Sequence, residues 1–315
     1  MQRNLFIPAV IVLSFLASIT GKKIIDGGLS KRTSVSGSHV LLSGQNARID
    51  RIVSMAPSIT EVLFALGLGE KLVGVTRYCD YPPEALAKPK VGGYLDPNYE
   101  AIFALQPDLV VHLTEQEKAG RFFNEMGLRT LTVDHSDVAG ILRSIPQIGG
   151  ACGAGGRAGE LLDDIRLRMK HIQEKVKGLP RPRVMVTVGR NLSYGTMQDI
   201  YISGSDGYYN ELIELAGGLN AYRERTVAFP AVSVEGIQQL DPQIIIEMIP
   251  NLEKDGLDKE KITRAWDFTS GVCAVKDGRV YVFGEDYVVR PGPRFILLLE
   301  QMTRAIHPEL NWEIR

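Results

Sequence analysis

Five aromatic residues are the side chains best placed for binding chemistry. They follow predicted strands or lie beside prolines, outside the spacing of a buried core: Tyr78, Tyr81, Tyr94, Phe229 and Tyr287. In α/β proteins such loops line the ligand crevice. Arg77, Arg190 and Arg290 lie in or near these loops and are expected to supply polar contacts. Aromatic walls suit a large, flat, partly apolar ligand, although the same rings could instead cap the edges of the lobes.

Two glutamates recur at matching positions of an internal repeat. Residues 98–111, NYEAIFALQPDLVV, align with residues 233–246, SVEGIQQLDPQIII, with Glu, Ile, Leu and Pro in register. The repeat predicts two similar lobes, with Glu100 and Glu235 in the first turn of corresponding helices. The helix dipole alone stabilises such a carboxylate by about 0.3–1 kcal/mol, so a purely structural role is also open.

The remaining chemical motifs are weaker. His112 and His135 end predicted strands and could bind bare Zn²⁺ or Mn²⁺, but single histidines there are more often structural. Asp134, His135 and Ser136 are contiguous, so they cannot converge as a hydrolase triad. Residues 153–158 have G-x-G-x-x-A spacing without the preceding strand that a dinucleotide site needs. We therefore expect no enzyme: no catalytic residue, no metal site and no cofactor.

Short apolar runs alternate with amphipathic segments, which is typical of an α/β fold. The first half predicts strands at residues 52–55, 72–75, 90–92, 109–112 and 130–133, and helices at 59–66, 99–105 and 116–126. Ser58 and Glu61 have the spacing of a capping box for the first helix. The second half predicts strands at 183–188, 244–248 and 280–283, and helices at 205–216, 234–240, 257–266 and 290–306. Pro291 and Pro293 are expected in the first turn of the last helix.

A single long helix is predicted between the two halves. Apolar residues of the 155–179 segment recur at steps of three and four, and Pro180 and Pro182 end the pattern. At about 1.5 Å per residue this helix is roughly 37 Å long, enough to cross a small domain. We expect two Rossmann-like α/β lobes, residues 49–150 and 181–315, each with its own core and joined by residues 151–180.

The N-terminus and the composition indicate an exported globular protein. Residues 5–19, LFIPAVIVLSFLASI, form an apolar run behind Arg3, so residues 1–21 are expected to be a signal peptide or an anchor. No cysteine follows the run, so lipid attachment there is not expected. Residues 22–48 have the composition of a flexible linker. The net charge of −1 offers no electrostatic case for nucleic acid, and three scattered cysteines do not make a disulfide framework.

The chain resembles the substrate-binding proteins of ABC importers for vitamin B12 and iron chelates. The resemblance is carried by RIVSMAPSITE at 51–61, YCDYPP at 78–83, the repeated E-x-I-x-x-L-x-P segments and the Pro-Arg opening of the last helix. It implies a binding protein that captures cobalamin between two lobes joined by one helix. A ferric siderophore or haem, and more distantly a bare Zn or Mn ion, are the alternative ligands.

The resemblance also implies roles for particular residues. The ligand pocket falls on Pro57, Ser58, Tyr78, Tyr94, Phe229, Asp286, Tyr287 and Arg290. Glu100 and Glu235 would pair with arginines of the permease dimer, which works with its ATPases, in the periplasm or on the outer face of the cytoplasmic membrane. Tyr94, Phe229 and Tyr287 stand where the best-known cobalamin binder has tryptophans, and Ala216 and Met302 replace its disulfide pair. Tyr94 could instead be an axial haem ligand. Only small lobe movement is expected, because one continuous helix has no loop hinge.

Overall fold

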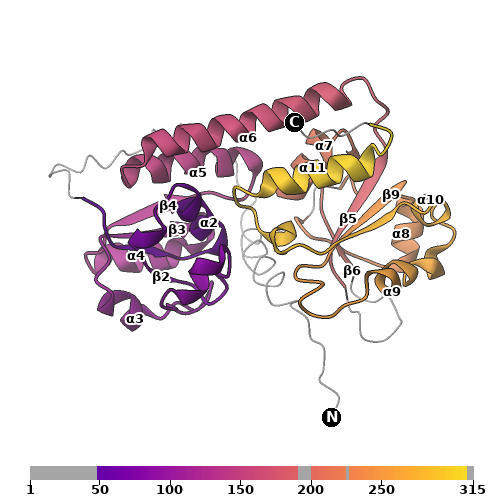
Figure 1. Ribbon diagram of the computed structural model, residues 1–315. Coiled ribbons are helices and arrows are strands. Elements are labelled where there is room, and N and C mark those ends of the chain that lie inside the picture. The colour runs from indigo at the N-terminus through magenta and orange to yellow at the C-terminus, as the bar shows by residue number, and fades with distance from the viewer. Residues whose placement is uncertain (1–47, 191–199, 225–226, 311–315) are drawn as a thin grey trace, which may run out of the picture.

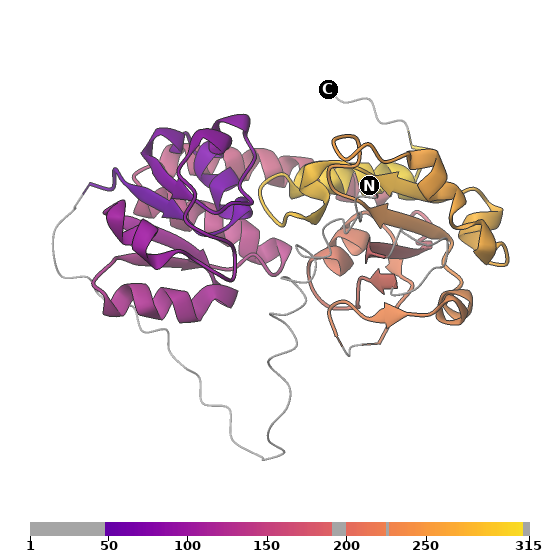
Figure 2. The same ribbon diagram turned by 90° about the horizontal axis from the view of Figure 1, so that it is seen from below.

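The computed structural model describes residues 48–190, 200–224 and 227–310, and it contains two α/β lobes side by side along one long helix (Figures 1 and 2). The predicted leader at 1–21 and the linker up to residue 47 lie outside the described residues. Within the described ranges, none of the helices has the length and apolar character needed to span a membrane. Cys79, Cys152 and Cys273 are free thiols.

The N-terminal lobe is built on a four-stranded parallel sheet in the order β2-β1-β3-β4. Its strands are β1 (Ile52–Ser54), β2 (Leu72–Val75), β3 (Leu109–Leu113) and β4 (Thr130–Val133), and its helices are α2 (Pro57–Ala65), α3 (Tyr99–Ala104), α4 (Glu117–Glu125) and α5 (Val138–Ala151). Apolar runs this short and continuous fit a parallel sheet that is covered on both faces. The strand predicted at 90–92 is wrong, because Lys90 and Gly92 form only isolated bridges, to Val75 and Pro97.

The C-terminal lobe is built on a mixed sheet in the order β10-β9-β5-β6-β8, with β7 beside β5. Its strands are β5 (Arg183–Gly189), β6 (Ile200–Ile202), β7 (Leu219–Asn220), β8 (Ala231–Val232), β9 (Ile244–Met248) and β10 (Val280–Phe283). Its helices are α7 (Tyr208–Leu215), α8 (Val234–Leu240), α9 (Lys259–Arg264), α10 (Cys273–Lys276) and α11 (Phe295–Ile306). The sequence prediction missed β6, β7 and β8, which are too short to show a period-two pattern.

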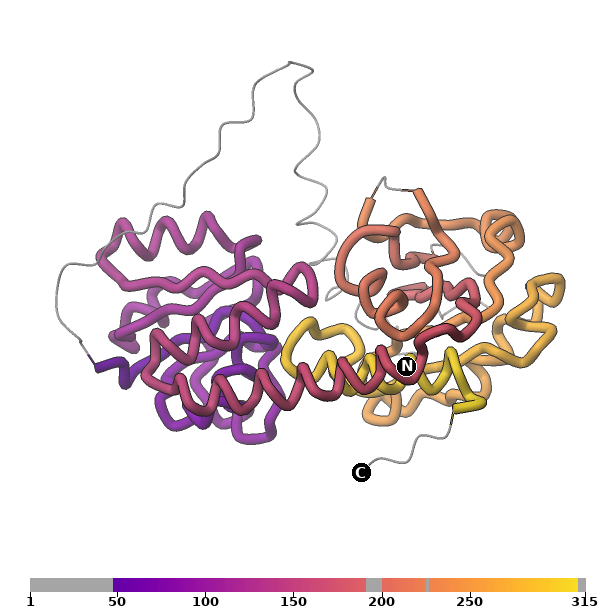
Figure 3. Tube along the Cα trace, turned by 90° about the horizontal axis from the view of Figure 1, so that it is seen from above, coloured from indigo at the N-terminus to yellow at the C-terminus, as the bar shows by residue number. Residues whose placement is uncertain are grey.

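The prediction of one long connecting helix is confirmed. Helix α6 (Gly155–Val176) is continuous, and it packs on α5, α7 and α11 as it passes over both lobes (Figures 1 and 3). It ends before Pro180 because Gly178 adopts a left-handed φ of 80°, a conformation that favours glycine and commonly ends helices.

Two helix starts differ from the prediction. Helix α2 begins at Pro57 behind Ala56, and no side chain caps it, so the predicted capping box is wrong. Helix α11 begins at Phe295, and Pro291 and Pro293 precede it instead of lying in its first turn. The residue before a proline is disfavoured in the helical region, and Pro293, two residues after Pro291, repeats this restriction and delays the start of the helix.

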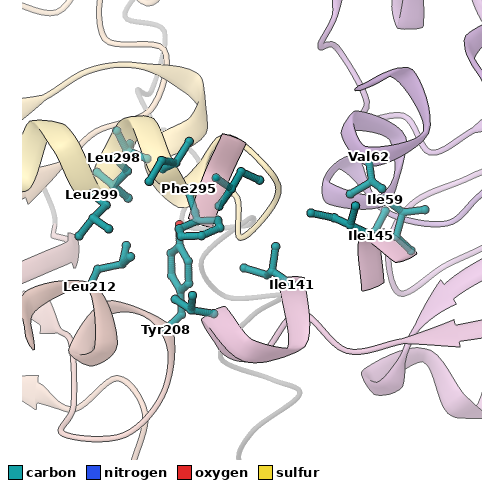
Figure 4. Close-up of a cluster of buried hydrophobic side chains, with 14 of the residues drawn as sticks. Ile59, Val62, Ile141, Ile145, Tyr208, Leu212, Phe295, Leu298 and Leu299 are labelled. Atoms are coloured by element: carbon teal, nitrogen blue, oxygen red, sulfur yellow. The ribbon is translucent and has the colours of Figure 1, made fainter. Parts of the chain in front are cut away.

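One apolar cluster extends across the lobe boundary, which differs from the expectation of two separate cores. Helices α2 and α5 contribute from one side and α7 and α11 from the other (Figure 4). Its members include Ile59, Val62, Ile141, Ile145, Tyr208, Leu212, Phe295, Leu298 and Leu299. Separating the lobes would expose this apolar surface to water at a cost of roughly 25 cal/mol per Å². The shared core therefore favours small lobe movements.

Candidate functional site

Charged side chains from both lobes meet at the lobe boundary. The carboxylate of Glu61, on α2, accepts hydrogen bonds from Nε (2.9 Å) and Nη2 (2.6 Å) of Arg294. Arg294 also donates from Nη1 (2.8 Å) and Nη2 (2.6 Å) to Asp286. Nη1 of Arg290 donates to Asp286 Oδ2 at 2.9 Å and lies 2.6 Å from Asp80 Oδ1, outside the angular range of a hydrogen bond. These five residues, which we call the boundary network, connect the two lobes.

The protonation preferences of the boundary network follow from burial and pairing. Burial raises the pKa of Glu61, while the bonds from Arg294 and the charge of Arg290 oppose the rise. Burial also acts to raise the pKa of Asp286, but Arg294 and Arg290 together hold it below its usual value. Arg294 has a raised pKa, because two carboxylates outweigh its desolvation. The guanidinium is therefore a fixed cation at the boundary.

Two tyrosines from opposite lobes lie close to this cation. The guanidinium carbon of Arg294 lies 3.5 Å from the ring centroid of Tyr81 and 5.4 Å from that of Tyr287. Tyr81 follows β2 in the N-terminal lobe, and Tyr287 lies in the 3-10 turn Asp286–Val289 of the C-terminal lobe. The side chain of Tyr81 is 40% exposed and that of Tyr287 is half-buried. The site therefore combines ring faces with a cation, which suits a planar ligand.

Ser58 belongs to a hydrogen-bond chain with a defined proton order. Its Oγ lies 2.8 Å from Nδ1 of His135, and Nε2 of His135 lies 2.8 Å from Oγ of Ser144. The Ser144 hydroxyl donates its one proton to the Ile141 carbonyl (2.8 Å), so it accepts from Nε2–H of His135. Nδ1 then accepts from Ser58. The oxygen of Ser58 is left only with acceptor capacity.

His112 and His135 are both engaged in hydrogen bonds inside the N-terminal lobe. Burial lowers the pKa of His135 to about 4, so its ring is neutral at pH 7 and both of its nitrogens are engaged. Burial also lowers the pKa of His112, whose Nδ1 and Nε2 contact the Leu113 carbonyl and the Thr132 hydroxyl. No group of three His, Cys, Asp or Glu side chains that could hold an ion occurs within the described ranges. The geometry therefore does not favour a bare-metal ligand.

Of the other predicted pocket residues, Pro57 and Ser58 lie at the start of α2, next to the lobe boundary. Pro57 is half-buried at the start of α2, and Ser58 packs beside Gly292 of the opposite lobe. Tyr94, Phe229 and Tyr287 all pack against the shared apolar cluster.

Phe229 lies edge-on to Tyr209, with 6.2 Å between ring centroids. The Tyr209 hydroxyl donates to the carbonyl of Val288 (2.7 Å), the residue after Tyr287. Tyr94 is fixed through its carbonyl, which accepts from Gln116 Nε2 at 2.7 Å. Tyr78 is half-buried beside Arg77, whose guanidinium carbon is 5.8 Å from its ring. Neither of these contacts of Tyr78 and Tyr94 involves the boundary network.

One of the three expected arginine contacts is wrong. Arg190 is 4% exposed and makes a bidentate ion pair with Glu247 inside the C-terminal lobe. Trp266 Nε1 donates to the same carboxylate at 2.8 Å. Arg190 therefore completes a buried polar cluster. Arg77 instead forms an exposed pair with Asp96, and Arg290 lies in the boundary network.

Glu100 and Glu235 occupy equivalent places in the two lobes. Both are exposed in the first turn of α3 or α8. Asn98 caps α3 by accepting from Ala101 N (3.0 Å), and Ser233 caps α8 by accepting from Gly236 N (3.2 Å). The repeat read from the sequence thus corresponds to the same local geometry twice.

The sequence prediction missed three participants at the boundary. Asp80 and Arg294 were not assigned to the site, and Glu61 was assigned to a helix cap. Glu61 and Arg294 are 233 residues apart, so no local pattern could pair them.

Known proteins match this chain over most of its length. Residues 52–287 match the family model described as periplasmic binding protein. The uncharacterized ABC transporter substrate-binding lipoprotein YvrC of Bacillus subtilis is 34% identical over 267 residues, which cover 82% of this chain and 80% of the relative. The vitamin B12-binding protein of Vibrio cholerae is 27% identical over 263 residues, covering 80% and 87%.

Solved structures share the fold over most of the chain. The periplasmic vitamin B12 binding protein BtuF of Vibrio cholerae matches with a TM-score of 0.71 at 25% identity, covering 82% of this chain and 97% of that one. The periplasmic heme-binding protein RhuT from Roseiflexus sp. RS-1 matches with a TM-score of 0.69 at 23% identity, covering 82% and 98%. The two lobes, the single connecting helix and the match over residues 52–287 lead to one conclusion: the chain belongs to the periplasmic binding protein family, as a substrate-binding protein of ABC transport.

Proposed function

We propose that this protein captures cobalamin, or a closely related metal chelate, at the boundary between its lobes and delivers it to an ABC permease. The observation that carries the proposal is the placement of Tyr81 and Tyr287, from opposite lobes, within 3.5 and 5.4 Å of the Arg294 guanidinium carbon. A large ring-shaped ligand can stack on the parts of these rings that Arg294 leaves open while Arg290 and Asp286 contact its polar periphery. The similarity to vitamin B12-binding proteins supports cobalamin as the first ligand to test.

Ser58 supports a ligand that presents hydrogen-bond donors. Its hydroxyl proton is committed to His135, so a ligand can meet only its acceptor lone pairs. The amide side chains of a corrin offer N–H donors, whereas the carboxylates of haem offer acceptors. The proton order at Ser58 therefore favours cobalamin over haem.

Calorimetry with cyanocobalamin, haem and ferric siderophores tests the proposal. We expect micromolar or tighter binding of cyanocobalamin and a loss of roughly tenfold in affinity for Tyr81→Ala, because one aromatic contact is removed. Phe268→Ala is the matched control, since Phe268 is 44% exposed and Tyr81 is 40% exposed. Flat titrations with all three ligand classes would contradict the proposal.

We also propose that Glu100 and Glu235 dock the protein on the two-fold permease. One exposed carboxylate at the same place in each lobe suits a partner with two equivalent basic sites. The variant Glu100→Lys/Glu235→Lys should lose binding to permease reconstituted in nanodiscs and keep its ligand affinity. Glu125→Lys/Glu253→Lys, which reverses two other exposed charges, should keep both. Loss of ligand affinity in the first variant would place these glutamates at the ligand instead.

This role requires export, to the periplasm or to the outer face of the cytoplasmic membrane. The apolar run at residues 5–19 supports it as a leader or anchor. Protease accessibility in intact and osmotically shocked cells tests the location. Cleavage of the protein only after lysis of the cytoplasmic membrane would refute it.

A further inference from the structure

The segment before α11 reaches across the lobe boundary and makes polar contacts that the hydrophobic core cannot supply. Figures 1 and 3 show this segment, in yellow, lying against the N-terminal lobe. At its centre Gly292 has no side chain, and a Cβ there would lie 3.3 Å from Cα of Ser58. The close approach brings Arg294 within reach of Glu61.

Arg294 fixes its two carboxylate partners relative to each other. It uses Nε and Nη2 for Glu61 of one lobe and Nη1 and Nη2 for Asp286 of the other. A planar guanidinium that binds two carboxylates in this way fixes the distance between them and their relative orientation. The side chains of Glu61 and Arg294 are 1% and 12% exposed, so solvent screens their attraction only weakly.

The apolar part of the boundary has no comparable directionality. The cluster around Ile141, Tyr208 and Phe295 excludes water, but dispersion and hydrophobic contacts tolerate sliding of one surface over another. The boundary network adds a polar contact with a single favourable geometry. The contact between Asp80 and Arg290 lacks hydrogen-bond geometry, and the side chain of Asp80 is 26% exposed whereas that of Glu61 is 1% exposed, so this contact is the one that a ligand can replace.

We propose that Arg294 is an interlobe tie: it sets the spacing between the lobes in the absence of ligand and positions Asp286 and Arg290 for binding. The tie through Glu61 persists when ligand enters, and the Asp80–Arg290 contact is exchanged for ligand contacts. The effect on ligand affinity rests on the proposed binding function, whereas the effect on lobe spacing does not.

Distance measurement by double electron–electron resonance tests the tie without any ligand. Spin labels at Lys118→Cys on α4 and Lys259→Cys on α9 report the interlobe distance, since both positions are exposed and lie on opposite lobes. Cys79 and Cys152 are buried, and Cys273 is replaced by serine to leave two labelling sites. We expect Arg294→Gln to broaden and lengthen the distance distribution relative to the unsubstituted chain.

Arg168→Gln is the matched control, because Arg168 pairs with Glu300 between α6 and α11 at 2.8 Å without engaging the boundary network. It should leave the distribution unchanged. The neutral pair Glu61→Gln/Arg294→Gln guards against unfolding of the single variant, because removing both members of a buried ion pair is far less destabilising than removing one. If Arg294 only compensates the buried charge of Glu61, this double variant should regain the original interlobe distance. If Arg294 is a tie, the double variant should not regain it.

Ligand affinity provides the second readout. If cyanocobalamin binds, the neutral pair should weaken it roughly tenfold, because Asp286 and Arg290 lose their fixed positions. If no ligand binds to the unsubstituted protein, the proposed function fails and the distance measurement still tests the tie. An unchanged distance distribution in both Arg294 variants would overturn the proposal.

Discussion

Replacing His135 with glutamine should remove much of the acid sensitivity of this fold. His135 is buried between Ser58 and Ser144, and its pKa falls from 6.5 to about 4, with desolvation as the main cause and Asp134 opposing it. The unfolded chain therefore takes up a proton below pH 6.5 that the folded chain refuses. Stability from this residue is fully present above pH 6.5 and is lost as the pH falls toward 4.

The size of the effect follows from the shift. A difference of roughly 2.5 pKa units at 1.36 kcal/mol per unit corresponds to about 3 kcal/mol of unfolding free energy. Glutamine does not titrate in this range. Between pH 6.5 and 4, the unfolding free energy of His135→Gln should therefore decrease by about 3 kcal/mol less than that of the unsubstituted protein. His112 is also buried with a lowered pKa, so part of the decrease in unfolding free energy with falling pH should remain in the variant.

Urea denaturation at half-unit pH steps measures these slopes. His171→Gln serves as the control, because it makes the same substitution at an exposed histidine of α6. The lower stability of His135→Gln at neutral pH does not enter the comparison, which concerns slope alone. Superimposable pH profiles for His135→Gln and the unsubstituted protein would refute the conclusion that His135 is buried and neutral. They would also refute the acceptor role assigned to Ser58.

Three further predictions follow from single contacts. Glu247→Ala should cost about 3–5 kcal/mol of unfolding free energy, because it leaves the buried Arg190 charge unpaired, while ligand affinity in calorimetry stays unchanged. Tyr209→Phe should cost about 1–2 kcal/mol in the same denaturation assay, because the Val288 carbonyl loses its donor. Tyr94→Phe should keep its affinity for cobalamin. Burial raises the pKa of Tyr94 and so disfavours the phenolate that haem ligation needs. Loss of a haem absorption band in this variant would reverse the ligand assignment.

Sequence patterns predicted the elements whose signals are local. Strand β9 (Ile244–Met248) has the predicted bounds, because a short, mainly apolar run rich in β-branched residues follows Pro242. The long helix was also recoverable, since its apolar stripe extends over several turns and Gly178 and Pro180 end it. The two-residue strands β7 and β8 carried no such pattern and appear only through pairing with neighbours.

The boundary itself was less accessible from sequence, because local rules offered competing explanations for the same residues. Ser58 and Glu61 fit a capping box by spacing, but tertiary partners took both side chains: His135 for the first and Arg294 for the second. A cap contributes about 1 kcal/mol and is available to an exposed helix end. The start of α2 is buried against the other lobe, so longer-range hydrogen bonds replace it.

Yet the sequence did carry a signal for these partners, in the form of single charges within apolar segments. Glu61 is the one charged residue of PSITEVLFA, Arg294 is followed by FILLL, and Glu247 interrupts IIIEM. A segment that is apolar on all sides is buried, and a charge within it must then be paired.

Each of these charges does have a buried partner: Glu61 and Arg294 pair with each other across the lobes, and Glu247 pairs with Arg190 within one lobe. The sequence pattern therefore predicts that a partner exists, and only the fold decides whether the pair stabilises one lobe or joins two. At Glu247 both members lie in the C-terminal lobe, so the pair can move with that lobe as a unit. At Glu61 the members lie in different lobes, and any change in lobe spacing must alter the pair. That difference makes Arg294, and not Arg190, the arginine through which lobe geometry can affect binding.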